Sequence, residues 1–304
     1  MLAAGLVVSR FVHFTAVLAL FGGALFPLYA VGGGRTPPPA RSGAWLRWIL
    51  IASAVAALVS GMSWFAFTAA SMSGTLAGAA DPTVLATVVE ATDFGVLWLG
   101  RLGLLAALVA IVLLNRRGKP GALAITALAG LALASLAATG HARTTEGWNG
   151  MLHILADAAH LLAAGVWLGG LWPLGFAVAH PHQGGTLDGR EIAAMLTRFS
   201  GVGYVAVAAL VASGLVNSWY LVGSIGGLTS APYGRLLLAK LALFVGMAML
   251  AAANRFWITP RLAKGPAETW LRRLRRHIAG EQALGLLVIA IVSVLGTLQP
   301  AIEA

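Results

Sequence analysis

Residues 153–170 read HILADAAHLLAAGVWLGG, an apolar stretch that carries three ionisable side chains. His153, Asp157 and His160 are spaced at i, i+4 and i+7, so they share one face of a helix. The stretch and the residues after it are long and apolar enough to cross a bilayer. Because an ionisable group inside a membrane span costs free energy, such groups usually mark a functional site. The pattern predicts a metal or proton site on a transmembrane helix.

The composition of the whole chain indicates a membrane protein. Of its 304 residues, 59% are hydrophobic and only 10% are charged, and the mean hydropathy is +0.86. A soluble domain does not need so much apolar surface, whereas spans of about 20 residues do. The sequence contains no Cys, which excludes thiolate metal sites, disulfides and CxxC redox motifs. It carries no hydrolase or dehydrogenase motif, and we expect no enzymatic activity.

Hydropathy and length predict eight membrane-spanning helices and therefore an all-α polytopic bundle. Arg10 lies inside the first apolar stretch and no basic segment precedes it, so we expect this span to be retained rather than cleaved as a signal peptide. The predicted spans cover residues 6–29, 45–70, 94–114, 122–142, 151–178, 199–222, 233–257 and 281–298.

The basic residues predict the orientation of the chain. Most of the 20 Lys and Arg residues fall in or beside the loops after the first, third, fifth and seventh predicted spans. Because loops rich in Lys and Arg stay in the cytoplasm, both termini are expected on the outer side of the membrane. The cluster at 272–276 is expected to face lipid headgroups. The net charge of +10 therefore reflects topology, and we expect no nucleic-acid partner.

The chain also repeats itself. Gly22 follows His13 by nine residues, and Gly169 follows His160 by nine residues. The second predicted span contains VAALVSG, and the sixth contains VAALVASG. We expect the two histidines to occupy equivalent positions and to face each other near an axis that relates the repeats.

A third pair of spans extends the repeat. Arg101 lies seven residues after the start of the third predicted span, and Lys240 lies seven residues after the start of the seventh. We predict two halves of four helices, residues 1–150 and 151–304. With four spans in each half, both halves have the same orientation, and their axis runs along the membrane normal.

The predicted outer half of the bundle gathers five candidate metal ligands: His13, His141, His153, Asp157 and His160. At about 1.5 Å per helical residue, the deepest of them lie about 10 Å or more below the surface. Imidazole suits copper, zinc, nickel and iron, and Asp157 could instead orient a ligating imidazole. The alternative is a structural one, in which a hydrogen-bonded His–Asp pair ties the fifth span to a neighbour.

Four further residues are accessory candidates. The thioethers of Met62 and Met151 are expected near the same end of the bundle, and thioethers select Cu(I). Arg101 and Lys240 lie within snorkelling reach of the interface, where they could counter an acidic residue or hold an anionic lipid or cofactor. For these two basic residues the structural interpretation is slightly favoured.

Several stretches of the sequence resemble a known family. They are RFS at 198–200, SGLVN at 213–217, APYGRLLLAK at 231–240, AANRF at 252–256 and LGTLQP at 295–300. With the span around His160 and the GHA at 140–142, they make the chain resemble the bacterial copper-resistance membrane protein CopD, also called PcoD, along essentially its whole length.

The resemblance implies an inner-membrane protein that handles copper ions, moves them mostly toward the cytoplasm and works with a periplasmic copper-binding protein of the CopC type. No CopC-like domain is present in this sequence, so we expect a separate partner in addition to membrane lipids. On this interpretation copper first meets His141 and His153 and then passes to His13, Asp157 and His160.

Two properties of such a path follow from the residues. Protons compete for imidazole nitrogens, so copper binding should weaken as pH falls through about 6.5. Beyond His160 the sequence offers few ligands toward the cytoplasm, namely Met247, Met249 and Asn254.

Two other functions remain open at this point. Two intramembrane histidines on different helices could ligate a haem b, with Arg101 or Lys240 near a propionate. Alternatively, the protein could bind copper or dock its periplasmic partner without transporting the ion.

Overall fold

The computed structural model describes residues 1–30, 42–114, 119–139, 147–180, 189–264 and 267–303. Within these ranges the chain is helical and has no strand, and 8 helices are long and apolar enough to cross a membrane. The all-α membrane bundle predicted from the sequence is confirmed. His141 lies outside the described residues, as do four of the arginines that predicted the orientation, Arg35, Arg41, Arg116 and Arg117.

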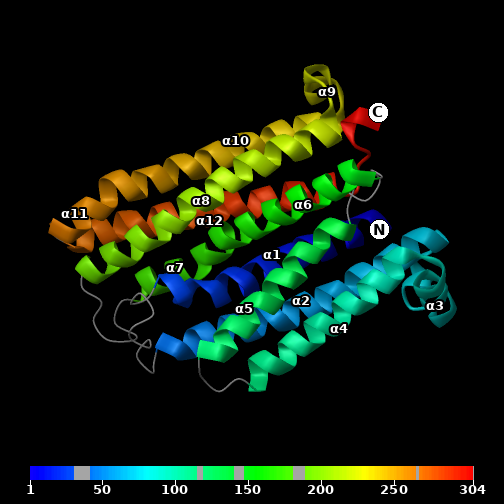
Figure 1. Ribbon diagram of the computed structural model, residues 1–304, viewed down its shortest axis with the longest axis horizontal. Helices are drawn as coiled ribbons and strands as arrows, with labels where there is room; N and C mark the ends of the chain where they lie inside the picture. The colour runs from blue at the N-terminus through cyan, green and yellow to red at the C-terminus, as the bar shows by residue number, and fades with distance from the viewer. Residues whose placement is uncertain (31–41, 115–118, 140–146, 181–188, 265–266, 304) are drawn as a thin grey trace.

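The long helices run roughly along one direction, and both termini lie at the same end of the bundle (Figure 1). The spans are formed by α1 (Leu2–Tyr29), α2 (Ser42–Ser73), α4 (Asp93–Leu114), α5 (Lys119–Ala134) with η3 (Ser135–Thr139), α6 (Gly147–Ala164) with the π-helical η5 (Gly165–Gly169) and α7 (Gly170–Ala179), α8 (Gly189–Val222), α10 (Pro232–Ala253) with the π-helical η6 (Asn254–Ile258) and α11 (Thr259–Lys264), and α12 (Ala267–Leu295). The short elements are η2 (Leu76–Ala79), α3 (Pro82–Ala91), α9 (Ile225–Ser230) and η7 (Ala301–Glu303).

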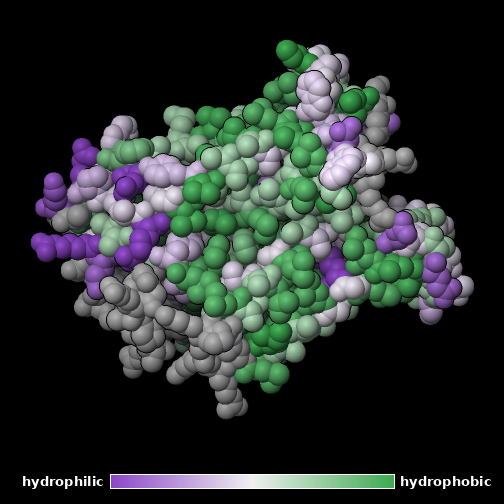
Figure 2. Space-filling view, viewed as in Figure 1, coloured by the Kyte–Doolittle hydropathy of each residue, from purple (hydrophilic) through white to green (hydrophobic). Residues whose placement is uncertain are grey.

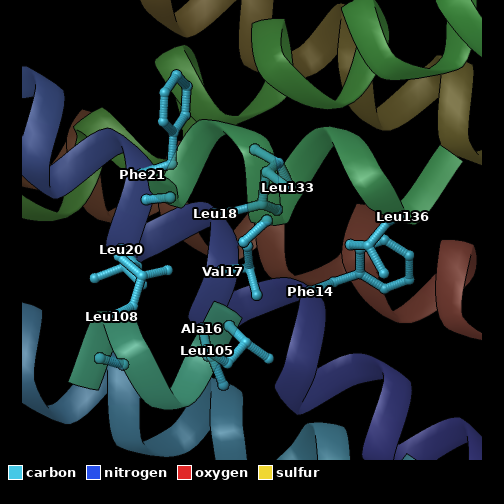
Figure 3. Close-up of a cluster of buried hydrophobic side chains, with 14 of the residues drawn as sticks. Phe14, Ala16, Val17, Leu18, Leu20, Phe21, Leu105, Leu108, Leu133 and Leu136 are labelled. Atoms are coloured by element: carbon cyan, nitrogen blue, oxygen red, sulfur yellow. The ribbon is translucent and has the colours of Figure 1, made fainter. Parts of the chain in front are cut away.

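Helix α1 forms the centre of the bundle. It packs against α2, α5, η5, α7 and α12, and 67% of the residues in its most apolar 18-residue stretch are buried. Phe14, Val17, Leu20 and Phe21 of α1 meet leucines of α4 and α5 in the largest hydrophobic cluster (Figure 3). A second cluster joins α7, α8, α10 and α12.

The outer surface of the bundle is apolar over its middle. Val205, Leu215 and Met249 are 71%, 68% and 68% exposed. Such exposure of large apolar side chains is unfavourable in water but favourable in contact with lipid. Figure 2 shows a hydrophobic band between two hydrophilic ends, with the densest polar group beside α11. We call that end, which carries Arg261 and the arginines at 272–276, the basic end.

Several predicted boundaries are wrong. The eighth span was expected over 281–298, but α12 begins at Ala267, so the arginines at 272–276 lie on a helix rather than in a loop. Helix α8 likewise begins at Gly189, ten residues before the predicted start. Hydropathy detects only the lipid-buried part of a helix, and helix formers such as Leu, Arg and Glu extend it into water.

The short helices α3 and α9 were not predicted. Each lies at the end that holds the termini and leads into a span (Figure 1). Asp81 caps α3 by accepting from the Thr83 amide at 2.8 Å, and Ser224 caps α9 through the Gly227 amide at 3.1 Å. Such caps are a local signal that a search for long apolar stretches does not use.

Candidate functional site

His13 is fully buried, and both of its ring nitrogens are hydrogen-bonded. Nδ1 lies 3.0 Å from the Ala57 carbonyl oxygen and 3.1 Å from Ser60 Oγ, whose own proton is donated to the Ala56 carbonyl at 2.5 Å. Arg101 donates from Nη2 to His13 Nε2 at 2.9 Å. Because a guanidinium has no acceptor, Nε2 must accept and Nδ1 must carry the proton. The lone pair of His13 is therefore occupied by Arg101.

Arg101 is only 3% exposed, and neutral groups surround it. Its guanidinium also donates to the Ala132 carbonyl and to Ser135 Oγ, and its Cζ lies 5.6 Å from the Trp98 ring centre. Carbonyl, hydroxyl and imidazole acceptors, rather than a carboxylate, thus balance a buried charge. The arrangement ties α4 to α1 and α5.

Arg10 completes this first group. It lies one turn before His13 on α1, and its Cζ stands 4.5 Å from the ring centre of Trp64, a cation–π distance. The edge of the Trp64 ring in turn meets His13 at 5.6 Å between ring centres. We call Arg10, His13, Ser60, Trp64 and Arg101 the N-terminal cluster.

Among the residues that the structure describes, His160 is hydrogen-bonded on one side of its ring only. Its Nδ1 lies 3.0 Å from Ser213 Oγ, and Ser213 donates its proton to the Ala209 carbonyl at 2.5 Å. The serine oxygen therefore accepts, and His160 Nδ1 carries the proton. The Leu210 carbonyl also accepts a hydrogen bond from this imidazole. The lone pair of the other nitrogen, Nε2, remains for a ligand.

Asp157 lies one turn before His160 and is also partly buried. Asn217 donates from Nδ2 to Asp157 Oδ1 at 3.1 Å, and the buried Oδ1 of Asn217 has no hydrogen-bond partner within the described ranges. Lys240 of α10 interacts electrostatically with both Asp157 and His160. We call Asp157, His160, Ser213, Asn217 and Lys240 the C-terminal cluster; it joins α6, α8 and α10.

The two clusters use the same positions for different chemistry. In each, an imidazole Nδ1 meets a serine whose hydroxyl bonds back to its own helix, and the next residue is a glycine, Gly61 or Gly214, against the ring. One turn before the histidine stands Arg10 in one cluster and Asp157 in the other. In both clusters a third helix contributes a basic residue, Arg101 from α4 or Lys240 from α10. The N-terminal cluster is thus positive, whereas the C-terminal cluster contains an acid.

The structure brings together only part of the predicted metal set. Asp157 and His160 share one cluster, whereas His13 contacts α2 and α4, so the expectation that His13 faces His160 is wrong. The cause is that each histidine turns toward the serine of its own half. Among the described residues, no three His, Asp or Glu side chains are grouped as a metal site.

The remaining candidates lie toward the end that holds the termini. His153 is 2% exposed and stacks on Tyr220, with 4.6 Å between ring centres. Met62 and Met151 are 47% and 55% exposed.

One buried acid was missed by the sequence reasoning. Glu281 of α12 is 2% exposed and accepts from Asn254 Nδ2 at 2.7 Å and from the side chain of Trp167. The predicted span began at Glu281, so the residue counted as a boundary. The apolar stretches near it, IAG at 278–280 and ALGLLV at 283–288, were the signal that it is buried between helices.

Fold and site together define a polytopic membrane protein with ionisable groups gathered between its helices. Residues 1–151 match the family described as Copper resistance protein D-like, N-terminal domain, and residues 193–295 match the family described as Copper resistance protein D. The chain belongs to this copper resistance protein D family, as the resemblance implied.

Curated relatives cover the whole chain. It is 35% identical to Copper resistance protein D of Pseudomonas syringae pv. tomato, over 97% of this chain and 96% of the relative. It is 30% identical to Inner membrane protein YebZ of Escherichia coli K12, over 99% and 100%. Copper transport protein CutJ of Bacillus subtilis 168 is 31% identical over 56% of this chain and 29% of its own length. No solved structure matches the chain. It is therefore a multi-pass inner-membrane protein of a copper-resistance family.

Proposed function

We propose that this protein takes up copper at the periplasmic side and moves it toward the cytoplasm, and that Asp157 and His160 bind the ion. The observation that carries the proposal is the fixed tautomer of His160, since its Nε2 lone pair is left for a ligand one helical turn from a carboxylate. Imidazole nitrogen is a good copper ligand, and a carboxylate adds negative charge.

Lys240 gives the empty site a counter-ion. It interacts with Asp157 and His160 from α10, so the buried carboxylate is not left uncompensated before the ion arrives. A copper ion beside Asp157 takes over this role and repels the ammonium group. Binding should therefore be an exchange of one cation for another, with Asn217 Oδ1 available as a further oxygen donor.

The other histidines have separate roles in this proposal. His141 and His153 provide the first contact for copper on the periplasmic side. His13 is a structural residue of the N-terminal cluster, because Arg101 occupies its lone pair. The same contact disfavours a bis-histidine haem b, since His13 would have to break its bond to Arg101 and turn toward another helix.

Orientation and partner follow from the charges. The described basic residues concentrate at the end opposite the termini, which supports periplasmic termini under the positive-inside rule. A periplasmic copper-binding protein of the CopC type would then dock at the end that holds α3 and α9. The printed name of the Bacillus subtilis relative, Copper transport protein CutJ, agrees with a role in transport.

We also infer that residues 1–150 and 151–304 arose by duplication. The matched contacts of the two clusters support this, and so do Gly95 and Gly234. A Cβ atom on either glycine would overlap the backbone of the short helix before its span, α3 in one half and α9 in the other.

The test is copper binding by the purified protein, wild type beside His160→Ala and Asp157→Asn, with His277→Ala at the basic end as the control. We expect stoichiometric copper in the wild type and the control and its loss in both site variants. Uptake into proteoliposomes should follow the same order. Copper retained by His160→Ala would refute the site.

Two other results would redirect the assignment. Binding without accumulation in proteoliposomes would support a docking or storage protein. A Soret band in the absorption spectrum, lost in His160→Ala, would support the haem alternative.

A further inference from the structure

Glu281 belongs to neither cluster and lies deep in the bundle. It is 2% exposed, on α12, and Asn254 of η6 is 7% exposed beside it. Along α10 and η6, Asn254 lies 14 residues beyond Lys240, about 21 Å toward the basic end at about 1.5 Å per residue. The acid is therefore separate from the proposed copper site.

Both side chains that donate to Glu281 come from π-helical segments. Trp167 is the middle residue of η5, and Asn254 is the first residue of η6. A π-helical turn widens the backbone ring and is frequently found at functional sites. Two such segments on different helices, both directed at one carboxyl group, indicate that the position of this acid is built into the fold.

The surroundings of Glu281 carry no compensating charge within the described residues. The arginines and lysines on its own helix and on the elements packed against α12 are engaged elsewhere or lie nearer the ends of their helices, and His277, one turn away on α12, has no charge interaction with Glu281. Arg255 donates to Thr197, Arg261 to the Trp257 carbonyl, and Arg275 to the Val178 carbonyl, while Lys240 belongs to the C-terminal cluster and His277 lies one turn nearer the basic end. An ionised carboxylate here would be a buried, unpaired charge, which is strongly unfavourable.

The unpartnered oxygen of Asn254 indicates how the charge is removed. Asn254 Nδ2 donates to Glu281 Oε1 at 2.7 Å, and Asn254 Oδ1 is buried with no donor in the described part of the chain. A protonated carboxyl supplies the missing donor, because an acid and an amide can pair through two hydrogen bonds, N–H to the acid carbonyl and O–H to the amide carbonyl. Protonation of Glu281 would then give Asn254 Oδ1 its donor and remove the uncompensated buried charge in one step.

We propose that Glu281 is a proton-binding site, in which the neutral acid donates from Oε2 to Asn254 Oδ1. When the site releases its proton, the O–H bond breaks, the electron pair stays on the carboxylate and the proton passes to water at the basic end. No electron moves. Resting on the proposed function, this proton is the one exchanged against copper during transport.

Infrared spectroscopy of the purified protein tests the proton site directly. An exposed glutamate is ionised at neutral pH, whereas a neutral acid shows a separate carbonyl stretch. We expect such a band in the wild type at neutral pH, its loss in Glu281→Gln, and its retention in Glu268→Gln, a matched control in the exposed first turn of α12. Asn254→Ala should shift the band to higher wavenumber. A spectrum unchanged in Glu281→Gln would overturn the proposal.

Two further readouts separate structure from coupling. Glu281→Gln keeps an amide that can donate to Asn254, so it should melt like the wild type, whereas Glu281→Ala should melt lower. In proteoliposomes, an imposed pH gradient should change copper uptake by the wild type but not by Glu281→Gln. An equal response in both would refute the coupling alone. If the wild type takes up no copper, the proposed function fails while the infrared result on Glu281 stands.

Discussion

Gly22 of α1 and Gly169 of η5 lie in direct backbone contact at the centre of the bundle. A Cβ atom built on Gly169 would lie 3.0 Å from the Cα atom of Gly22 and would overlap the Leu18 carbonyl. Each glycine follows its histidine by nine residues. Small residues let membrane helices approach closely. This glycine pair therefore joins α1, in residues 1–150, to η5, in residues 151–304.

Alanine at this contact should destabilise the protein. Gly169→Ala has no room for its methyl group and should cost about 1–3 kcal/mol, as overpacking does. Gly103→Ala on α4 is the control, because nothing lies within 4 Å of its Cβ position and alanine is the better helix former. Thermal unfolding in detergent should give a lower Tm for the first variant and an equal or higher Tm for the second. If both variants melt at the same temperature, the backbone around Gly22 and Gly169 shifts enough to accommodate the methyl group, which would contradict the prediction.

Removing the guanidinium should disrupt the N-terminal cluster. Arg101→Met leaves His13 Nε2 and Ser135 without their donor, and each unsatisfied buried group costs about 1–3 kcal/mol. We expect a lower Tm with unchanged copper affinity, since Asp157 takes its partners, Asn217 and Lys240, from the other cluster. Arg190→Met, exposed at the start of α8, should melt like the wild type. A large loss of copper affinity in Arg101→Met would place His13 in the metal site after all.

The two serines should differ in their effect on copper. Ser213→Ala removes the hydroxyl acceptor that holds His160 Nδ1 beside the Leu210 carbonyl, and loss of such an orienting partner typically weakens metal binding about 10–100-fold. Ser60→Ala makes the equivalent change beside His13 and should leave copper affinity unaltered. Isothermal titration with copper on both variants checks this. Equal weakening by the two serine variants would contradict the separation of the clusters.

Lys240→Met should have opposite effects on stability and on binding. Without the ammonium, Asp157 is a buried charge lacking its counter-ion, so the metal-free protein should melt lower. Copper no longer has to displace a cation, and its affinity should rise about tenfold, which corresponds to about 1.4 kcal/mol. Calorimetry and melting curves on the same preparation measure both. A weaker copper affinity would mean that Lys240 assists binding rather than competing.

The sequence was sufficient for the fold class because eight apolar stretches of bilayer length admit few alternatives. It was insufficient for the ends of the helices, as α12 shows, because arginines that leave the membrane continue the helix without any change in periodicity. The short helices α3 and α9 were not predicted for a related reason. Both are shorter than a membrane span, and the caps that mark them are local signals that a hydropathy search does not use.

The candidate site was only partly predictable. The spacing of Asp157 and His160 along one helix placed them together correctly. The position of His13 could not be foreseen, because its orientation depends on hydrogen bonds to Ala57 and Arg101 from two other helices. Glu281 was missed because its partners, Asn254 and Trp167, become neighbours only when three spans pack.

The N-terminal cluster has Arg10 at the position where the C-terminal cluster has Asp157. This difference affects how many copper ions each chain can bind. A cation attracted to the acid in one cluster is repelled by the paired guanidinium groups in the other, so each chain should hold a single ion at this depth. Occupancy should then follow a simple hyperbola in copper concentration, with a Hill coefficient of about one. The C-terminal cluster would act as the binding compartment and the N-terminal cluster as a rigid support.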